Sequence, residues 1–158
     1  MDWSSVIADP VLSGLPFKIE LNEWGKIVMS PASNAHGMLQ TAIVVLLKEQ
    51  LPSGKAFVEC SIQTSKNVKV ADVVWCSNEF FRQHGKSTPY TESPEIVVEV
   101  ASPSNRLAEL VEKRVLYFEK GAQEVWICEE TGDMIFYRMD GRLAESVACP
   151  GFPQKVEA

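Results

Sequence analysis

Two acidic residues lie inside short apolar runs. Glu99 interrupts the run 96–100, whose other members are Ile or Val, and Asp72 lies near the start of the β-branched and aromatic run 70–76. A carboxylate in a buried strand is costly unless it is paired or binds a metal. Two such carboxylates on adjacent strands would share a proton or a cation, and a hard divalent ion suits oxygen ligands. The alternative, equally compatible with these two runs, is that both acids face water or cap turns at strand ends.

The first third of the chain contains a hairpin and a helix. Residues 17–30 alternate apolar and polar side chains on both sides of a turn and predict an antiparallel hairpin with Glu20 on its polar face. Ser33 or Asn34 can cap a helix that continues to about Gln50 and has His36 in its first turn. Considered alone, Glu20 is typical of a solvated strand residue and His36 of a capping or packing residue.

The rest of the chain is mostly strands. We expect a long strand over 56–66, a polar loop with a turn of helix over 77–90, a strand over 123–128, and hairpin strands over 134–138 and 143–148. Turn residues such as Asp140-Gly141 separate them. No repeat, low-complexity segment or internal boundary is visible, so we expect residues 1–158 to form a single domain.

A second helix is expected from about Arg106 to Lys120, ending at Gly121. Its predicted core stripe is apolar at helical spacing and consists of Leu107, Leu110, Val111, Val115 and Phe118. Arg106, Lys113 and Tyr117 share the flank of that stripe. The alternative for Lys113 is a surface lysine paired with Glu109 at spacing i, i+4.

The composition of the chain excludes several classes of protein. The chain has 158 residues, of which 46% are hydrophobic and 23% charged, with a net charge of -6. These values are ordinary for a globular protein and argue against one that coats nucleic acid electrostatically. There is no apolar run of membrane-spanning length and no basic-then-apolar leader at the N-terminus, so we expect a cytoplasmic protein. The four cysteines form no C-x-x-C pair, which favours buried reduced thiols over a zinc site.

In this order, the motifs resemble the restriction-endonuclease-like superfamily, whose hallmark is written PD-(D/E)XK. The resemblance is strongest to a bacterial branch of endonuclease-like proteins that is numerous in cyanobacteria. It covers about residues 17–137. The matching pieces are Ile19-Glu20-Leu21, Gly25 to Pro31, His36, Ala71-Asp72-Val73-Val74, Pro94 to Ser104, Lys113, Tyr117 and Gly121 to Trp126.

The resemblance implies an α/β (α+β) fold with a mixed central β-sheet flanked by helices and with N-terminal and C-terminal β-hairpins. It implies that Asp72 and Glu99 hold Mg²⁺ or Mn²⁺. The superfamily pattern places a lysine two residues after the second acid, where this chain has Ala101, and the branch instead takes its lysine from the next helix, at Lys113. Glu20 and His36 would lie at the rim of the site.

Three functional hypotheses follow. The resemblance implies a Mg²⁺-dependent endonuclease that cleaves DNA, with Asp72, Glu99 and Lys113 at its centre. A catalytically silent interaction or scaffold module of the same fold is favoured by the acidic balance, because no Lys/Arg-rich face for a duplex is visible. A homodimer, formed through the hairpin or the C-terminal tail, is compatible with either hypothesis.

Overall fold

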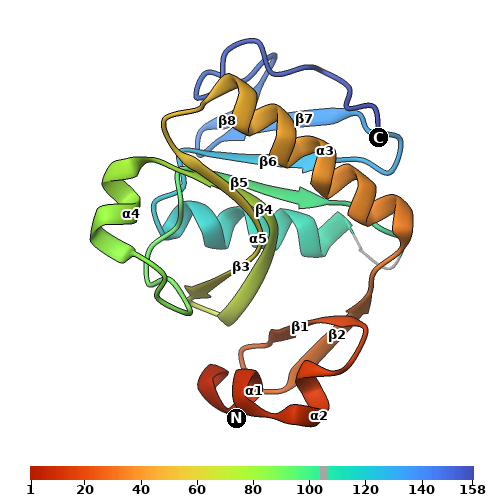
Figure 1. The fold of residues 1–158 in the computed structure, drawn as a ribbon, viewed down its shortest axis with the longest axis vertical. Coiled ribbons are helices and arrows are strands. Elements are labelled where there is room, and N and C mark those ends of the chain that lie inside the picture. The colour runs from red at the N-terminus through yellow and green to blue at the C-terminus, as the bar shows by residue number, and fades with distance from the viewer. Residues whose placement is uncertain (104–106) are drawn as a thin grey trace.

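The fold is described by a computed structural model, which covers residues 1–103 and 107–158. The elements are α1 (Trp3–Ala8), α2 (Pro10–Ser13), β1 (Phe17–Leu21), β2 (Ile27–Pro31), α3 (Asn34–Gln50), β3 (Lys55–Thr64), β4 (Asn67–Cys76), α4 (Asn78–His84), β5 (Ile96–Val100), α5 (Leu107–Glu119), β6 (Glu124–Cys128), β7 (Met134–Arg138) and β8 (Gly141–Leu143). Figure 1 shows their arrangement in space.

A six-stranded mixed sheet forms the centre of the molecule. Its strand order is β3-β4-β5-β6-β7-β8, and β5 and β6 are parallel whereas the other neighbours are antiparallel. Helix α5 connects the two parallel strands, as a crossover between parallel strands requires. The expected mixed sheet flanked by helices is confirmed.

Helices cover both faces of this sheet (Figure 1). Successive strand residues point to opposite faces, so Val73 and Val98 pack with α3, whereas Val74 and Val97 pack with Tyr117 of α5. Glu99 has the same strand parity as Val97 and lies on the side of α5, where it bonds to Tyr117. At Asp72 the alternation is interrupted, because Ala71 and Val74 belong to one cluster, and Asp72 is contacted by His36 of α3.

Strands β1 and β2 form a separate two-stranded ribbon, the expected N-terminal hairpin, which lies with α1 and α2 at one end of the molecule (Figure 1). Leu21 of the ribbon packs against Val68 and Val70 of β4. Two polar contacts fix this position: the Val70 N–H donates to Glu20 Oε2 at 2.7 Å, and Lys69 Nζ donates to the Leu21 carbonyl at 3.2 Å. The ribbon thus turns the polar face of β1 towards β4.

The predicted core stripe of α5 is confirmed at Leu110 and Phe118 and wrong at Leu107, Val111 and Val115. Leu107 is 79% exposed, and Val111 and Val115 are exposed as well, whereas the buried residues are Leu110, Lys113, Leu116 and Tyr117. The helix is rotated because Lys113 and Tyr117 bond to carboxylates below it, and these contacts outweigh burial of a few valine side chains. Arg106, expected on the same flank, lies outside the described residues.

The expected strand over 143–148 is also wrong, because β8 ends at Leu143. The following backbone bonds to a buried side chain instead of a neighbouring strand. Glu124, at the start of β6, accepts from the N–H groups of Val147 and Ala148 at 2.8 and 2.7 Å and from Ser146 Oγ at 2.7 Å. This carboxylate fastens the C-terminal segment to the sheet.

Within 1–103 and 107–158, none of the helices combines the length and the apolar character needed to cross a membrane. The four cysteines are buried and reduced, as expected.

Candidate active site

Asp72 and Glu99 meet on the buried side of adjacent strands. The antiparallel register pairs Val73 of β4 with Val98 of β5, so the two acids come next beyond the last of these pairs. Asp72 is 1% exposed and Glu99 is 2% exposed. The alternative in which both acids face water at strand ends is therefore excluded.

A lysine from the ribbon lies between the two acids. Lys18 Nζ is 2.9 Å from Asp72 Oδ1 and 3.4 Å from Glu99 Oε2. One ammonium thus bridges both carboxylates, at the position where two converging acids require a cation.

Asp72 has further partners on both sides. The Val100 N–H donates to Asp72 Oδ2 at 2.7 Å, and His36 Nε2 lies 3.2 Å from Oδ1. His36 comes from the first turn of α3, which begins at a Ser33 cap. One turn later, Gln40 Nε2 donates to the backbone carbonyl of Asp72 at 3.1 Å. Helix α3 therefore fixes both the side chain and the backbone of this acid.

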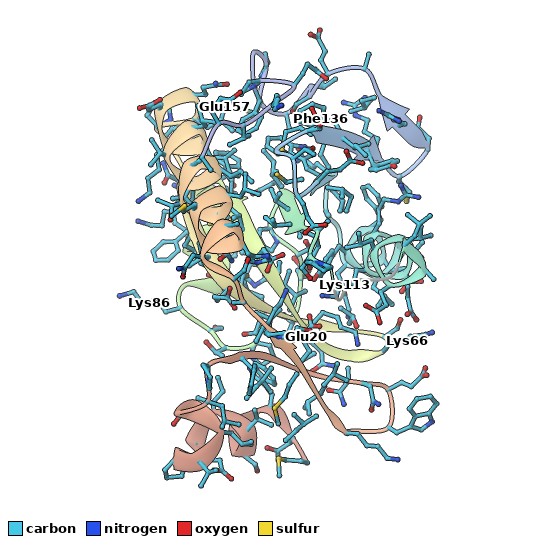
Figure 2. The ribbon with its side chains drawn as sticks, turned by 90° about the vertical axis from the view of Figure 1, so that its right-hand side faces the viewer. Glu20, Lys66, Lys86, Lys113, Phe136 and Glu157 are labelled. Atoms are coloured by element: carbon cyan, nitrogen blue, oxygen red, sulfur yellow. The ribbon has the colours of Figure 1, made fainter. Side chains whose placement is uncertain are left out.

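Glu99 is held from α5. Tyr117 donates its hydroxyl to Glu99 Oε1 at 2.7 Å, and Lys113 Nζ lies 3.5 Å from the same oxygen. Lys113 also pairs with Glu20 Oε2 at 2.8 Å. Figure 2 shows the Glu20 and Lys113 side chains close together in the interior, between the ribbon and α5. Lys113 is 8% exposed and pairs with Glu20, so it is not the surface lysine of the alternative reading.

The charges of this cluster shift its ionisation. Burial opposes the negative charge of Asp72, but Lys18 and His36 outweigh it and hold the pKa of Asp72 below its ordinary value. Burial likewise opposes the charge of Glu20, and Lys113 and Lys18 lower its pKa. For Glu99 burial prevails and raises the pKa to about 7, although both lysines act in the opposite direction.

The two groups that contact these acids shift as well. The hydrogen bond to Asp72 raises the pKa of His36 against the opposing effect of burial. Burial and the neighbouring Glu99 raise the pKa of the Tyr117 hydroxyl well above its usual range, so Tyr117 is a hydrogen-bond donor at neutral pH. His36 is therefore protonated more readily beside Asp72 than a free imidazole is.

A small opening lies at the cluster. It has a volume of about 30 Å³, and Lys18, His36, Asp72 and Lys113 are among its lining residues. The residues outside the gap at 104–106 contain no group of three or more His, Cys, Asp or Glu side chains placed to hold a metal ion. The oxygen donors that converge here are two carboxylates, and Mg²⁺ is commonly bound by one or two carboxylates and water. The donor set therefore fits a hard divalent cation.

The structure brings together all five residues singled out from the sequence: Glu20, His36, Asp72, Glu99 and Lys113. Two further residues of the cluster, Lys18 and Gln40, were missed. Lys18 is two residues before Glu20, so strand alternation places both on one face. Gln40 is four residues after His36, so both lie on one helix face. These spacings are visible in the sequence and could have indicated both residues.

Comparison with known proteins identifies the family of this chain. Residues 14–154 match the family Uma2, described as "Putative restriction endonuclease". No curated protein matches. A solved structure described as a putative nuclease belonging to DUF820 from Anabaena variabilis ATCC 29413 is similar in fold, with a TM-score of 0.66 and 17% identity, over 76% of this chain and 71% of that one. The chain therefore belongs to the Uma2 family and has a restriction-endonuclease-like fold.

Proposed function

We propose that the chain is a metal-dependent endonuclease that hydrolyses phosphodiester bonds in DNA. The observation that carries this proposal is the convergence of Asp72 Oδ1 and Glu99 Oε2 on one cationic centre, beside a second buried lysine. Family membership supports the same reaction class. Fold alone would not, because one fold serves many activities.

Asp72 and Glu99 would hold Mg²⁺ or Mn²⁺. Their two facing oxygens lie on either side of the Lys18 ammonium, so a divalent ion would compete with that ammonium for the same pair of carboxylates. When bound, such an ion polarises a phosphate and lowers the pKa of a coordinated water.

The residues around the acids have distinct roles in this proposal. Lys113 would stabilise negative charge that develops on the phosphate, because its ammonium reaches the site from α5 and Glu20 holds it in place. Tyr117 keeps Glu99 oriented through its hydroxyl, and His36 does the same for Asp72. Glu20 and His36 thus act as positioning residues.

The second candidate is a catalytically silent module of the same fold. The contact that favours it is again Lys18, which already neutralises both acids without a metal. In this case, the cluster would serve only to fasten the ribbon and α5 to the sheet. The two candidates differ in whether a divalent ion can replace the ammonium.

We also propose a homodimer that forms through the ribbon. Trp24, in the turn between β1 and β2, is 74% exposed, and Phe17 and Met29, which lie on one face of the ribbon, are exposed as well. Several large apolar side chains on one ribbon form a surface that a second copy can cover. Light scattering after gel filtration tests this, and Trp24→Ser should shift the chain towards monomer.

The test of the main proposal is thermal unfolding with and without Mn²⁺. We expect the ion to raise the Tm of the wild type, and Asp72→Ala or Glu99→Ala to abolish this increase. Glu130→Gln, an exposed acid far along the chain, is the matched control and should keep it. A wild-type Tm that does not change with millimolar Mn²⁺ would favour the catalytically silent module.

Plasmid nicking tests the chemistry directly. We expect Mg²⁺-dependent conversion of supercoiled plasmid to the open-circular form, with loss of activity in Lys113→Met, which removes the charge but keeps most of the length of the side chain. Lys26→Met removes an exposed lysine of the ribbon turn and serves as control. Nicking that survives in Lys113→Met would remove this lysine from the mechanism.

A further inference from the structure

A large cavity lies beside the proposed active site, along the β3 edge of the sheet. It has a volume of about 710 Å³, within the usual range for pockets that hold small ligands. Its walls come from β3, the end of α3, α4 and the loop that precedes Tyr90. Strand β3 is one of the two edge strands of the sheet, and Tyr90 covers part of its edge by bonding to the backbone of Ser61 and Gln63.

Three lysines surround this cavity. Lys48, Lys55 and Lys86 are exposed and line it, and the acid among its lining residues is Glu59. None of the three lysines forms an ion pair with a described residue. Figure 2 shows Lys86 projecting outward from its loop. The cavity is therefore positively charged on a chain whose net charge is -6.

Aromatic side chains form part of the same wall. Phe57, Phe81 and Tyr90 line the cavity, and Lys55 Nζ lies 4.6 Å from the centre of the Phe81 ring. Lysines that can meet phosphates, placed beside aromatic rings that can stack on bases, are typical of surfaces that bind single-stranded nucleic acid. A duplex keeps its bases stacked and could not use these rings.

The cavity and the small opening at the proposed active site share the lining residue Glu59. This residue has a φ of 56° and no partner in the register, which pairs Val58 with Val73 and Cys60 with Ala71. The pairing keeps the same register on both sides, so Glu59 lies opposite Asp72 at a break in the β3–β4 ladder, with no inserted residue. Glu59 lines both the large cavity and the small opening at Asp72. Gln40 links the two places, since its Nε2 donates to Glu59 Oε1 at 2.9 Å and to the Asp72 carbonyl at 3.1 Å.

We propose that this cavity binds an unpaired stretch of DNA next to the bond that is cut. Lys48, Lys55 and Lys86 contact its phosphates, and Phe57 and Phe81 stack on its bases. The inference rests on the proposed nuclease function and specifies its substrate as DNA with a single-stranded segment, such as a frayed end, a gap or a flap.

Fluorescence anisotropy with a labelled oligothymidylate tests the proposal. The full chain is used in EDTA, so that binding is measured without cleavage. We expect the wild type to bind the oligothymidylate more tightly than a blunt duplex of the same length. In the triple variant Lys48→Ala, Lys55→Ala, Lys86→Ala, the Kd should rise roughly tenfold or more at low salt, and the slope of log K against log salt should become shallower by about 2, as expected for three lost phosphate contacts.

The matched control removes three other lysines, Lys26, Lys120 and Lys155, which line none of the cavities described above. It changes the net charge equally and should bind almost as the wild type does. Phe81→Leu separates stacking from charge: it should weaken binding about 5- to 100-fold and leave the salt slope unchanged. Equal Kd values for the two triple variants, or equal affinity of the wild type for duplex and oligothymidylate, would overturn the proposal.

A footprint on the wild-type chain gives a readout without any variant. Bound oligothymidylate should protect Lys48, Lys55 and Lys86 from acetylation, measured by mass spectrometry, while Lys26 and Lys155 stay reactive. If the cavity lysines stay unprotected in a protein that nicks plasmid, DNA binding in the cavity is refuted and the proposed nuclease function stands. If they are protected in a protein that neither nicks plasmid nor responds to Mn²⁺, DNA binding in the cavity is supported and the proposed nuclease function is refuted.

Discussion

Replacing Lys18 by Met should expose the repulsion between the two buried acids. The ammonium lies 2.9 Å from Asp72 Oδ1 and 3.4 Å from Glu99 Oε2, which corresponds to roughly 5 kcal/mol of attraction to each at an effective dielectric constant of about 20. Burial of the ammonium offsets much of this, and the net cost of breaking such a buried pair is about 3–5 kcal/mol. For a chain of this length, we expect the Tm to fall by roughly 10 °C.

The loss should depend on pH in a defined direction. The pKa of Glu99 is already raised to about 7 by burial, and loss of Lys18 would raise it further. A carboxyl group with a raised folded-state pKa favours the folded state while it is protonated, and this contribution disappears as the pH rises through that pKa. The variant should therefore be closest to the wild type in mild acid and furthest from it at about pH 8.

Urea unfolding at both pH values, with and without Mn²⁺, measures the effect. Mn²⁺ should stabilise Lys18→Met more than the wild type, since the ion no longer competes with an ammonium. Lys66→Met is the matched control: Lys66 pairs with Glu23 and Glu112 at the surface, and such pairs contribute about 0–1 kcal/mol. A Lys18→Met protein as stable as the wild type at alkaline pH and without metal would refute the bridging role of Lys18.

Three other changes test the surrounding contacts. Tyr117→Phe removes the hydroxyl that bonds to Glu99 and should cost about 1.5–3 kcal/mol in urea unfolding, whereas an unchanged midpoint would contradict the bond. Glu20→Gln should lower stability at neutral pH, but its deficit should shrink as the pH falls: the pKa of Glu20 is lowered, so its contribution exists above the unfolded-state pKa and is lost on protonation. Glu124→Ala leaves the donors of Ser146, Val147 and Ala148 without their acceptor and should lower stability by about 3 kcal/mol or more. Limited proteolysis should then cut the C-terminal segment early. Resistance to protease equal to that of the wild type would count against the role of Glu124 in holding this segment.

The sequence was most informative where a charged residue stands within an apolar run, because its burial is unfavourable without a partner. An acid inside a β-branched run needs a partner, so Asp72 and Glu99 could be recognised before any contact was known. Lys18 could not be recognised in this way, because a lysine on the polar face of a hairpin is ordinary until that face is known to turn inward. The ribbon docks on β4 through contacts between residues about 50 positions apart, and local patterns do not encode such contacts.

The orientation of α5 shows the opposite case. Apolar spacing predicted a stripe that includes Val111 and Val115, yet the helix buries Lys113 and Tyr117. Apolar spacing identifies the helix face whose burial is favourable when the neighbouring surface is apolar. Here the surface under the helix contains acids, so burial of the face with Lys113 and Tyr117 is favoured. Those acids are brought under the helix only when the sheet assembles.

The bridge made by Lys18 also has a consequence for biosynthesis. Lys18 contacts Asp72 and Glu99 across 54 and 81 positions of the chain, and Lys113 follows later still. During translation, the first cation therefore leaves the ribosome long before either acid, and the last one follows both. A nascent polypeptide cannot assemble this charge cluster until most of its length has emerged, which places formation of the centre among the late, non-local steps of folding. Prematurely terminated products that end before α5 would lack Lys113 and Tyr117, and would leave Glu99 without two of its partners.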